Sequence, residues 1–270
     1  MDSFLLAPFY VLRKHIDILL APAIPIVFLL AFLILTSDSN STETVLNSTD
    51  YYLGGTMFLS ASNLTAYNDI STNVQIPLIR LGGISEKTHI QELVSPNPSN
   101  FLLIFVVLFL GFISYVMVAR AVYAINEEER TIMGLEGING ASIVLCLAAA
   151  FLMLFISSFS LGGFKLFLVI SFGTYFTFSI PYAAAGQPLG ESIFLGFKFM
   201  SQMGKIVAGY IGCMGAAIMI PIALLIFTGP LIINVEPAVS DFLKLVLGLF
   251  GVIFALFYQM ALCASVVFEK

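Results

Sequence analysis

The feature that most constrains this chain is the run of residues 206–227, which contains no charged side chain. A helix rises ~1.5 Å per residue, so about 20 apolar residues cross a hydrocarbon core of ~30 Å. Because lipid offers the backbone no hydrogen-bond partner, a helix is favoured there over any open form. The run predicts a membrane-spanning helix, and the amphipathic stretch before it, 186–205, predicts a helix lying in the membrane plane.

The composition extends this prediction to most of the chain. Hydrophobic residues make up 59% of the 270 residues and charged residues 10%, against ~25% in soluble domains. The mean hydropathy is +1.02, and no soluble core could bury the apolar surface that this value implies. A net charge of −5 argues against a nucleic-acid partner. The three cysteines all lie in apolar runs, so no disulfide framework is predicted.

The pattern predicts an all-α membrane protein with six transmembrane helices, in-plane amphipathic helices and a small extracellular loop domain. Residues 1–15 predict an interfacial helix, 16–36 the first transmembrane helix and 37–100 the loop domain. Residues 101–270 predict a five-helix transmembrane region that includes the interfacial helix. Within the region the expected spans are 101–119, 141–161, 166–182, 206–227 and 242–268.

The predicted loop domain differs in composition from the rest. It is rich in Ser, Thr, Asn and Gly, and short strands are predicted at 56–60 and 73–81. Three Asn-x-Ser/Thr sequons, at Asn40, Asn47 and Asn63, make these asparagines glycosylation candidates. The loop is therefore expected on the outer face, and the protein is expected to be a glycoprotein.

The distribution of basic residues predicts the orientation. Six spans place both termini on one side, and the positive-inside rule assigns the more basic side to the cytoplasm. The side of the termini carries Arg13, Lys14, Arg120, Arg130, Lys198, Lys205 and Lys270, and the other side carries Arg80, Lys87, Lys165 and Lys244. Both termini are therefore expected in the cytoplasm of a multi-pass cell-membrane protein.

Two sets of residues inside the spans are candidates for a functional role. Small residues recur at helical spacing in the 206–227 run, and helix packing is favoured over substrate lining for them: Ala208, Gly209, Gly212, Gly215 and Ala216. The second set is polar, and it either lines a cavity or forms interhelical hydrogen bonds: Ser171, Thr174, Tyr175 and Tyr210.

The chain lacks the usual signs of catalysis. The acidic run at 127–129 cannot converge on one metal ion, because adjacent helical residues point in different directions. His15 lies at a predicted interface and His89 in the outer loop, and no Asp or Glu lies in the middle of a span. No metalloprotease, serine-hydrolase or phosphate-loop motif is present. We expect no enzyme activity, no cofactor and no metal site.

Three stretches resemble a loose set of uncharacterised six-helix membrane families from archaea and bacteria. The set includes the membrane domain attached to glycerophosphoryl diester phosphodiesterases. The similar stretches begin PFYVLRKHIDILLAP, ARAVYAINEEERTIM and IPYAAAGQPLGESIF, at residues 8, 119 and 180. The chain departs from these families in having only Lys198 and Lys205 as basic residues in the third stretch. The resemblance implies a six-helix fold and an archaeal membrane location, and it implies no catalytic residue.

These observations together predict a non-enzymatic accessory or scaffold component of a cell-membrane assembly. Its expected partners are membrane lipids and a protein bound through the 37–100 loop. The alternative is a transporter or permease subunit for an uncharged or lipid-like substrate, since no ionisable group lies in the middle of a span.

Overall fold

A computed structural model describes residues 6–36, 98–128, 131, 133–158, 163–233 and 237–268. The predicted strands and the three sequons lie outside these residues. Every regular element of the described part is helical, which confirms the all-α prediction there. The α-helices are α1 (Ala7–Lys14), α2 (Leu20–Thr36), α6 (Pro98–Asn126), α7 (Gly140–Ser158), α8 (Gly163–Ala184), α9 (Leu189–Met200), α10 (Met203–Ile233) and α11 (Pro237–Phe268), and two short 3-10 helices are η2 (Ile16–Leu19) and η3 (Leu135–Gly137).

Among the described residues, three helices are long and apolar enough to cross a membrane. They are Ile104–Asn126 in α6, Phe167–Ala184 in α8 and Leu249–Phe268 in α11. Shorter apolar helices cover Ile16–Phe28 and Gly140–Ile156. This arrangement is compatible with a multi-pass membrane protein.

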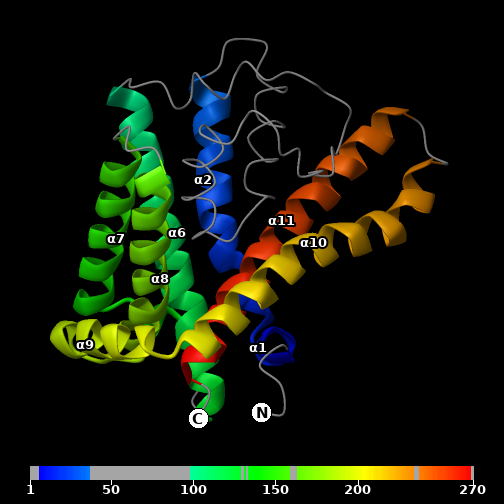
Figure 1. Ribbon diagram of the computed structural model, residues 1–270. Coiled ribbons are helices and arrows are strands. Elements are labelled where there is room, and N and C mark those ends of the chain that lie inside the picture. Colours follow the sequence, from blue (N-terminus) through cyan, green and yellow to red (C-terminus); the bar gives the residue numbers. More distant parts are fainter. Residues whose placement is uncertain are drawn as a thin grey trace.

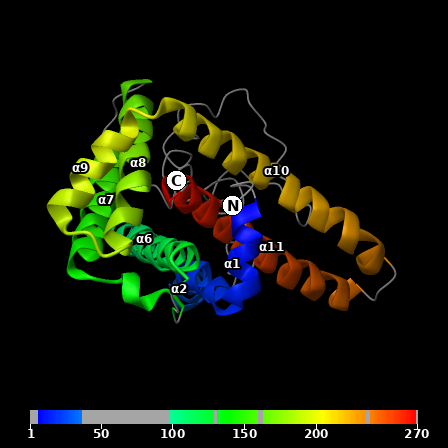
Figure 2. The same ribbon diagram turned by 90° about the horizontal axis from the view of Figure 1, so that it is seen from below.

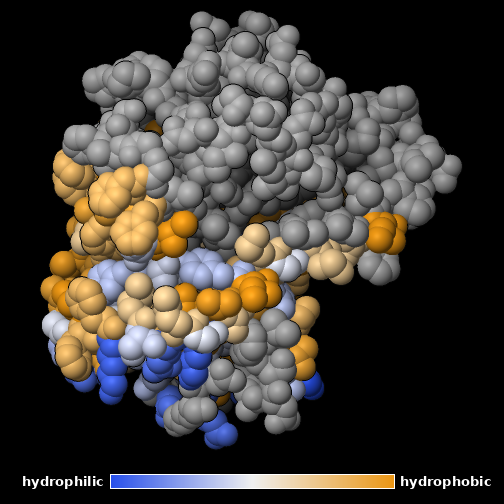
Figure 3. All heavy atoms as spheres, in the orientation of Figure 1, coloured by the Kyte–Doolittle hydropathy of each residue, from blue (hydrophilic) through white to orange (hydrophobic). Residues whose placement is uncertain are grey.

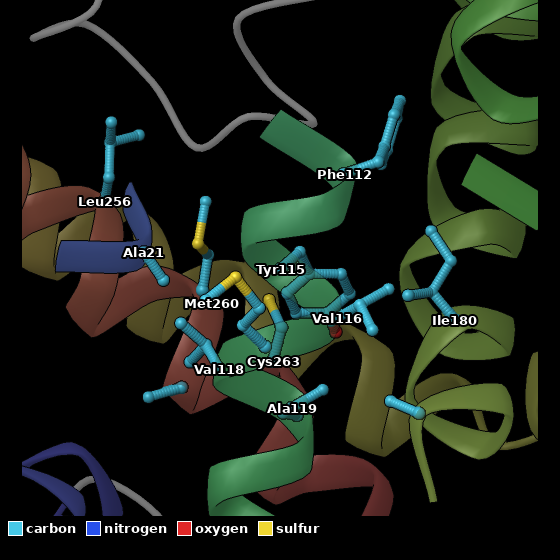
Figure 4. Packing of buried hydrophobic residues seen from close by; sticks show 14 of the residues in the cluster. Ala21, Phe112, Tyr115, Val116, Val118, Ala119, Ile180, Leu256, Met260 and Cys263 are labelled. Atoms are coloured by element: carbon cyan, nitrogen blue, oxygen red, sulfur yellow. The ribbon is translucent and has the colours of Figure 1, made fainter. Parts of the chain in front are cut away.

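Helix α6 lies at the centre of the bundle, where it packs against α2, α7, α8 and α11 (Figure 1). Residues from Tyr115 to Ala119 are at most 2% exposed. Tyr115 lies beside Cys263 of α11, and Val116 points toward Ile180 of α8 (Figure 4). The charge-free run at 206–227 is thus not the centre of the fold, because α10 packs mainly against α11.

Helix α6 also extends beyond the predicted end of the second span. The residues after Arg120 continue the helix to Asn126, and Ala121, Val122 and Ala124 are buried. The guanidinium carbon of Arg120 lies 5.2 Å from the centre of the Tyr123 ring, a cation–π contact. A charged residue therefore marks the edge of the apolar region without ending the helix.

Helices α10 and α11 form an antiparallel hairpin that reaches away from the other helices (Figures 1 and 2). The last part of α11 returns to the core, where Leu256, Phe257 and Met260 are almost fully buried. In the described part of α10, Val207 and Ile211 are more than half exposed, whereas Ile206 and Cys213 are buried. The hairpin is thus anchored at its base.

Helices α1 and α9 lie at the same end of the bundle, and α9 runs across the ends of α7 and α8 (Figure 1). Helix α9 buries Gly196 and Phe199 and exposes Phe194 and Phe197. Hydrophilic residues gather at the lower edge of the molecule, below a band of apolar ones (Figure 3). The predicted 186–205 helix is interrupted, since α9 ends at Met200 and α10 begins at Met203.

Candidate functional site

Buried polar side chains gather where the base of the hairpin meets α6 and α8. We call this group the polar seam, and it consists of Tyr115, Thr174, Thr177, Tyr210, Cys213, Gln259 and Cys263. Most of its members are buried; Tyr210 is partly buried. A polar group in an apolar setting is costly unless it is hydrogen-bonded, so the partners of these atoms define what the seam can do.

The Tyr115 hydroxyl completes a hydrogen bond that Pro181 removes from α8. Proline has no N–H, so the carbonyl four residues before it loses its helical donor. That carbonyl belongs to Thr177, and the Tyr115 hydroxyl donates to it at 2.8 Å. Tyr115 is fully buried on α6. This bond therefore joins α6 to α8 at the proline and leaves no unpaired carbonyl there.

Of the four predicted cavity residues, Thr174 and Tyr210 are brought together and Tyr175 lies elsewhere. The Thr174 hydroxyl donates to the Ile170 carbonyl at 2.6 Å, so its oxygen accepts the Tyr210 hydroxyl at 2.5 Å. The Tyr175 hydroxyl donates instead to the Ile193 carbonyl on α9 at 3.4 Å. Ser171 is half-buried on α8. A shared cavity for all four stays a prediction.

Other hydroxyls in the seam and next to it bond within their own helix. The donors and acceptors lie four residues apart: Ser114 to Leu110 (2.9 Å), Thr177 to Gly173 (2.6 Å) and Ser179 to Tyr175 (2.8 Å). Hydroxyls in membrane helices commonly bond in this way, and the bond satisfies the donor without a partner on another helix. These hydroxyl protons are therefore already engaged.

Two thiols and one amide link α10 to α11 at the seam. The Sγ atoms of Cys213 and Cys263 lie 3.4 Å apart. The Gln259 Nε2 donates to the Cys213 carbonyl at 3.2 Å, while its Oε1 is buried and has no partner among the described residues. Sequence reasoning did not single out Gln259, although it is the one amide side chain in the 242–268 run.

The small residues of α10 differ in their surroundings. A Cβ on Gly209 would lie 3.8 Å from Val266 of α11 and 4.0 Å from Phe178 of α8, so this glycine is in close packing. Ala216 is buried, whereas Ala208 and Gly212 are half-buried. A Cβ on Gly215 would meet no described atom within 4 Å. The face that packs on α11 thus includes Gly209, Cys213 and Ala216.

Sequence reasoning also missed a capped turn at the basic end of the bundle. The Asn139 Oδ1 accepts the Ser142 N–H and the Ser142 hydroxyl accepts the Asn139 N–H, both at 2.9 Å, a reciprocal N-cap for α7. The Asn139 Nδ2 donates to the Ala183 carbonyl at 2.7 Å. Asp17, whose spacing from Arg13 allows an ion pair, accepts the Met133 N–H at 2.9 Å.

In the described part of the chain, no three His, Cys, Asp or Glu side chains gather into a group able to hold a metal ion. The three cysteines are free and buried. No family model matches this chain, and no curated protein or solved structure is similar enough to count as a match.

Proposed function

We propose that this protein crosses the cell membrane six times, with both termini in the cytoplasm, and acts as an accessory or scaffold component of a membrane assembly. The three long apolar helices, together with apolar α2, α7 and α10, support six crossings. Helix α1 and the end of α11 lie at one end of the bundle (Figure 1), as an even number of crossings requires. Exposed Arg13, Lys14 and Lys198 at that end support its assignment to the cytoplasm.

The observation that carries the scaffold proposal is the apolar flank of the hairpin. Four apolar side chains of α10 are each more than half exposed: Met203, Val207, Ile211 and Met214. Helix α10 itself extends far from the bundle (Figure 2). Nearby Gly215 has no described atom within 4 Å of the place where a Cβ would stand, and small residues let a neighbouring helix approach closely. Such a flank suits a helix of a partner protein within the membrane, while the 37–100 loop would contact the partner outside.

Transport of an uncharged or lipid-like substrate is the less well supported alternative. A polar path needs groups that are free to exchange their partners with a substrate. The hydroxyls of Thr174 and Tyr210 bond to each other, and that of Tyr175 turns to α9. Three of the four polar groups named for a path thus have partners within the protein, which supports a structural role for those three.

Crosslinking in native membranes tests the proposal. A photoreactive amino acid replaces Ile211 on the apolar flank, Asn63 in the outer loop or, as a matched control, buried Val116 of α6. We expect the first two to attach one protein in stoichiometric amount and Val116 to link only within the chain. A monomer that carries lipid alone at both positions, with no partner after mild-detergent purification, contradicts the proposal.

A further inference from the structure

Among the described residues, the strongest unassigned chemistry is the pair of thiols at the base of the hairpin. Cys213 of α10 and Cys263 of α11 are 50 positions apart in sequence, yet their Sγ atoms are 3.4 Å apart. A disulfide bond is about 2.05 Å long, so the two sulfur atoms must move about 1.4 Å closer to form one. Both cysteines are at most 4% exposed. The third cysteine, Cys146, is buried on α7, which packs against α6 and α8.

A second observation is an unpaired hydrogen-bond acceptor on the residue one helical turn before Cys263. Gln259 precedes Cys263 by one turn, and its Nε2 donates to the Cys213 carbonyl at 3.2 Å. The Gln259 side chain is 2% exposed, and its Oε1 has no partner among the described residues. A buried acceptor of this kind is costly unless a donor reaches it. An O–H group formed on either sulfur would be such a donor.

We propose that Cys213 and Cys263 are a redox pair that a lipid-soluble hydroperoxide closes into a disulfide. One sulfur attacks the terminal peroxide oxygen, the O–O bond breaks, and an alcohol leaves with the proton of that thiol. The sulfur is now a sulfenic acid, whose O–H donates to Gln259 Oε1. The second sulfur attacks the first, the S–O bond breaks, and water leaves with the second thiol proton. The two thiols supply the two electrons that reduce the peroxide.

The location of the pair selects this class of oxidant. Cys263 lies within Leu249–Phe268, one of the three helices apolar enough to cross a membrane, and charged oxidants enter such surroundings poorly. A hydroperoxide is neutral and dissolves in the bilayer.

Closing the pair would fix α10 to α11 where the hairpin joins the seam. Tyr210 lies one turn before Cys213 and bonds to Thr174 of α8. The cross-link would therefore lie next to a hydrogen bond that already joins α10 to the bundle. In the oxidised protein α10 and α11 should therefore stay packed at the seam at temperatures at which the two helices separate in the reduced protein. This inference does not depend on the scaffold proposal.

Mass spectrometry of the wild-type protein tests the pair directly. The protein in lipid nanodiscs is treated with cumene hydroperoxide, its remaining thiols are alkylated, and it is digested without reductant. We expect a peptide that joins Cys213 to Cys263, lost again on reduction, while Cys146 stays alkylated. The proposal is overturned if both thiols remain reduced, if Cys146 is oxidised as fast, or if the disulfides join separate chains.

Matched variants locate the chemistry. Cys213→Ser or Cys263→Ser should abolish the cross-linked peptide, and Cys146→Ser should leave its yield unchanged. Gln259→Met should slow its formation roughly fivefold, the effect of losing one hydrogen bond, with the same final yield. An unchanged rate would remove Gln259 from the reaction. The wild-type experiment decides the main point even if a variant fails to fold.

Discussion

At the residue scale, side chains from neighbouring helices supply most of the hydrogen-bond partners that a helix of the seam does not supply itself. Pro181 takes a donor away from α8, and Tyr115 of α6 supplies one in its place. Gln259 differs, because its side-chain N–H donates a hydrogen bond while its side-chain oxygen has no partner among the described residues. The first arrangement stabilises the fold, and the second leaves a position with unused hydrogen-bonding capacity.

A double-mutant cycle can test the contribution of the Tyr115 hydrogen bond to stability. Tyr115→Phe removes the donor and leaves the buried Thr177 carbonyl unpaired, which should lower the free energy of unfolding by about 1–3 kcal/mol. Pro181→Ala restores the helical N–H, so Tyr115→Phe in that background should cost less by about 1 kcal/mol. Both costs are measured by denaturant titration in mixed micelles. If Tyr115→Phe lowered the free energy of unfolding equally in the two backgrounds, the Tyr115 hydroxyl would not be replacing the N–H that Pro181 lacks.

At the element scale, helix ends and crossings are set by a few contacts. Helix α8 ends at Ala184, and Gly186 just beyond its end has a φ of +92°, which suits glycine. The Gln187 N–H then bonds to the Tyr182 carbonyl at 3.1 Å, the closing bond of a Schellman motif. This turn sends the chain into α9, which crosses back over α8 with Gly196 against Ser179.

The crossing of α9 over α8 depends on the absence of a side chain at Gly196. A Cβ there would overlap the Ser179 hydroxyl, so Gly196→Ala should destabilise the protein by about 1–3 kcal/mol. Gly190→Ala on the same helix is the matched control, because its Cβ would meet no described atom within 4 Å. The melting temperature should fall in the first variant only, and Ser179→Gly should restore part of it. Similar melting temperatures for both alanine variants would contradict this packing.

The sequence predicted the class of the elements better than their ends or their roles. Apolar runs predicted where α6, α8 and α11 lie, because crossing lipid requires length and apolar side chains. They could not identify α6 as the central helix, since residues that face lipid are as apolar as those that face protein. Arg120 was expected to end a span, but packing of Ala121 and Val122 continues the helix.

The polar seam was predictable only in part. Hydroxyls in one span and Tyr210 in the next suggested contact across helices, and Thr174 meets Tyr210. The sequence also shows that Pro181 frees a carbonyl, yet nothing in it identifies Tyr115 as the donor. That pairing, like the approach of Cys213 to Cys263, depends on the register between helices distant in the chain, which hydropathy does not encode.

At the scale of the whole molecule, the charged and apolar regions are separated along the bundle. Helices α1 and α9 mark one end, where Arg13, Lys14 and Lys198 are exposed, and apolar side chains cover the flank above it (Figure 3). Exposed Phe194 and Phe197 of α9 lie beside these charges, as expected for a helix at the boundary of lipid and water. The hairpin adds apolar surface away from this end.

The proposed orientation can be tested with single cysteines and a thiol reagent that does not cross membranes. In a background that carries Cys146→Ser, Cys213→Ser and Cys263→Ser, one new cysteine is placed by Asn63→Cys, Arg13→Cys or Lys198→Cys. Arg13 and Lys198 are exposed on the two helices that mark the basic end, so the positive-inside rule places them in the cytoplasm. We expect the reagent to label only the Asn63 variant in intact cells, and all three variants in lysed cells.

Labelling of the Arg13 and Lys198 variants before lysis, with the Asn63 variant protected, would invert the orientation, because the basic end would then face outward. It would also remove the outer loop as a site for an external partner, whereas the contacts of the polar seam would remain as described.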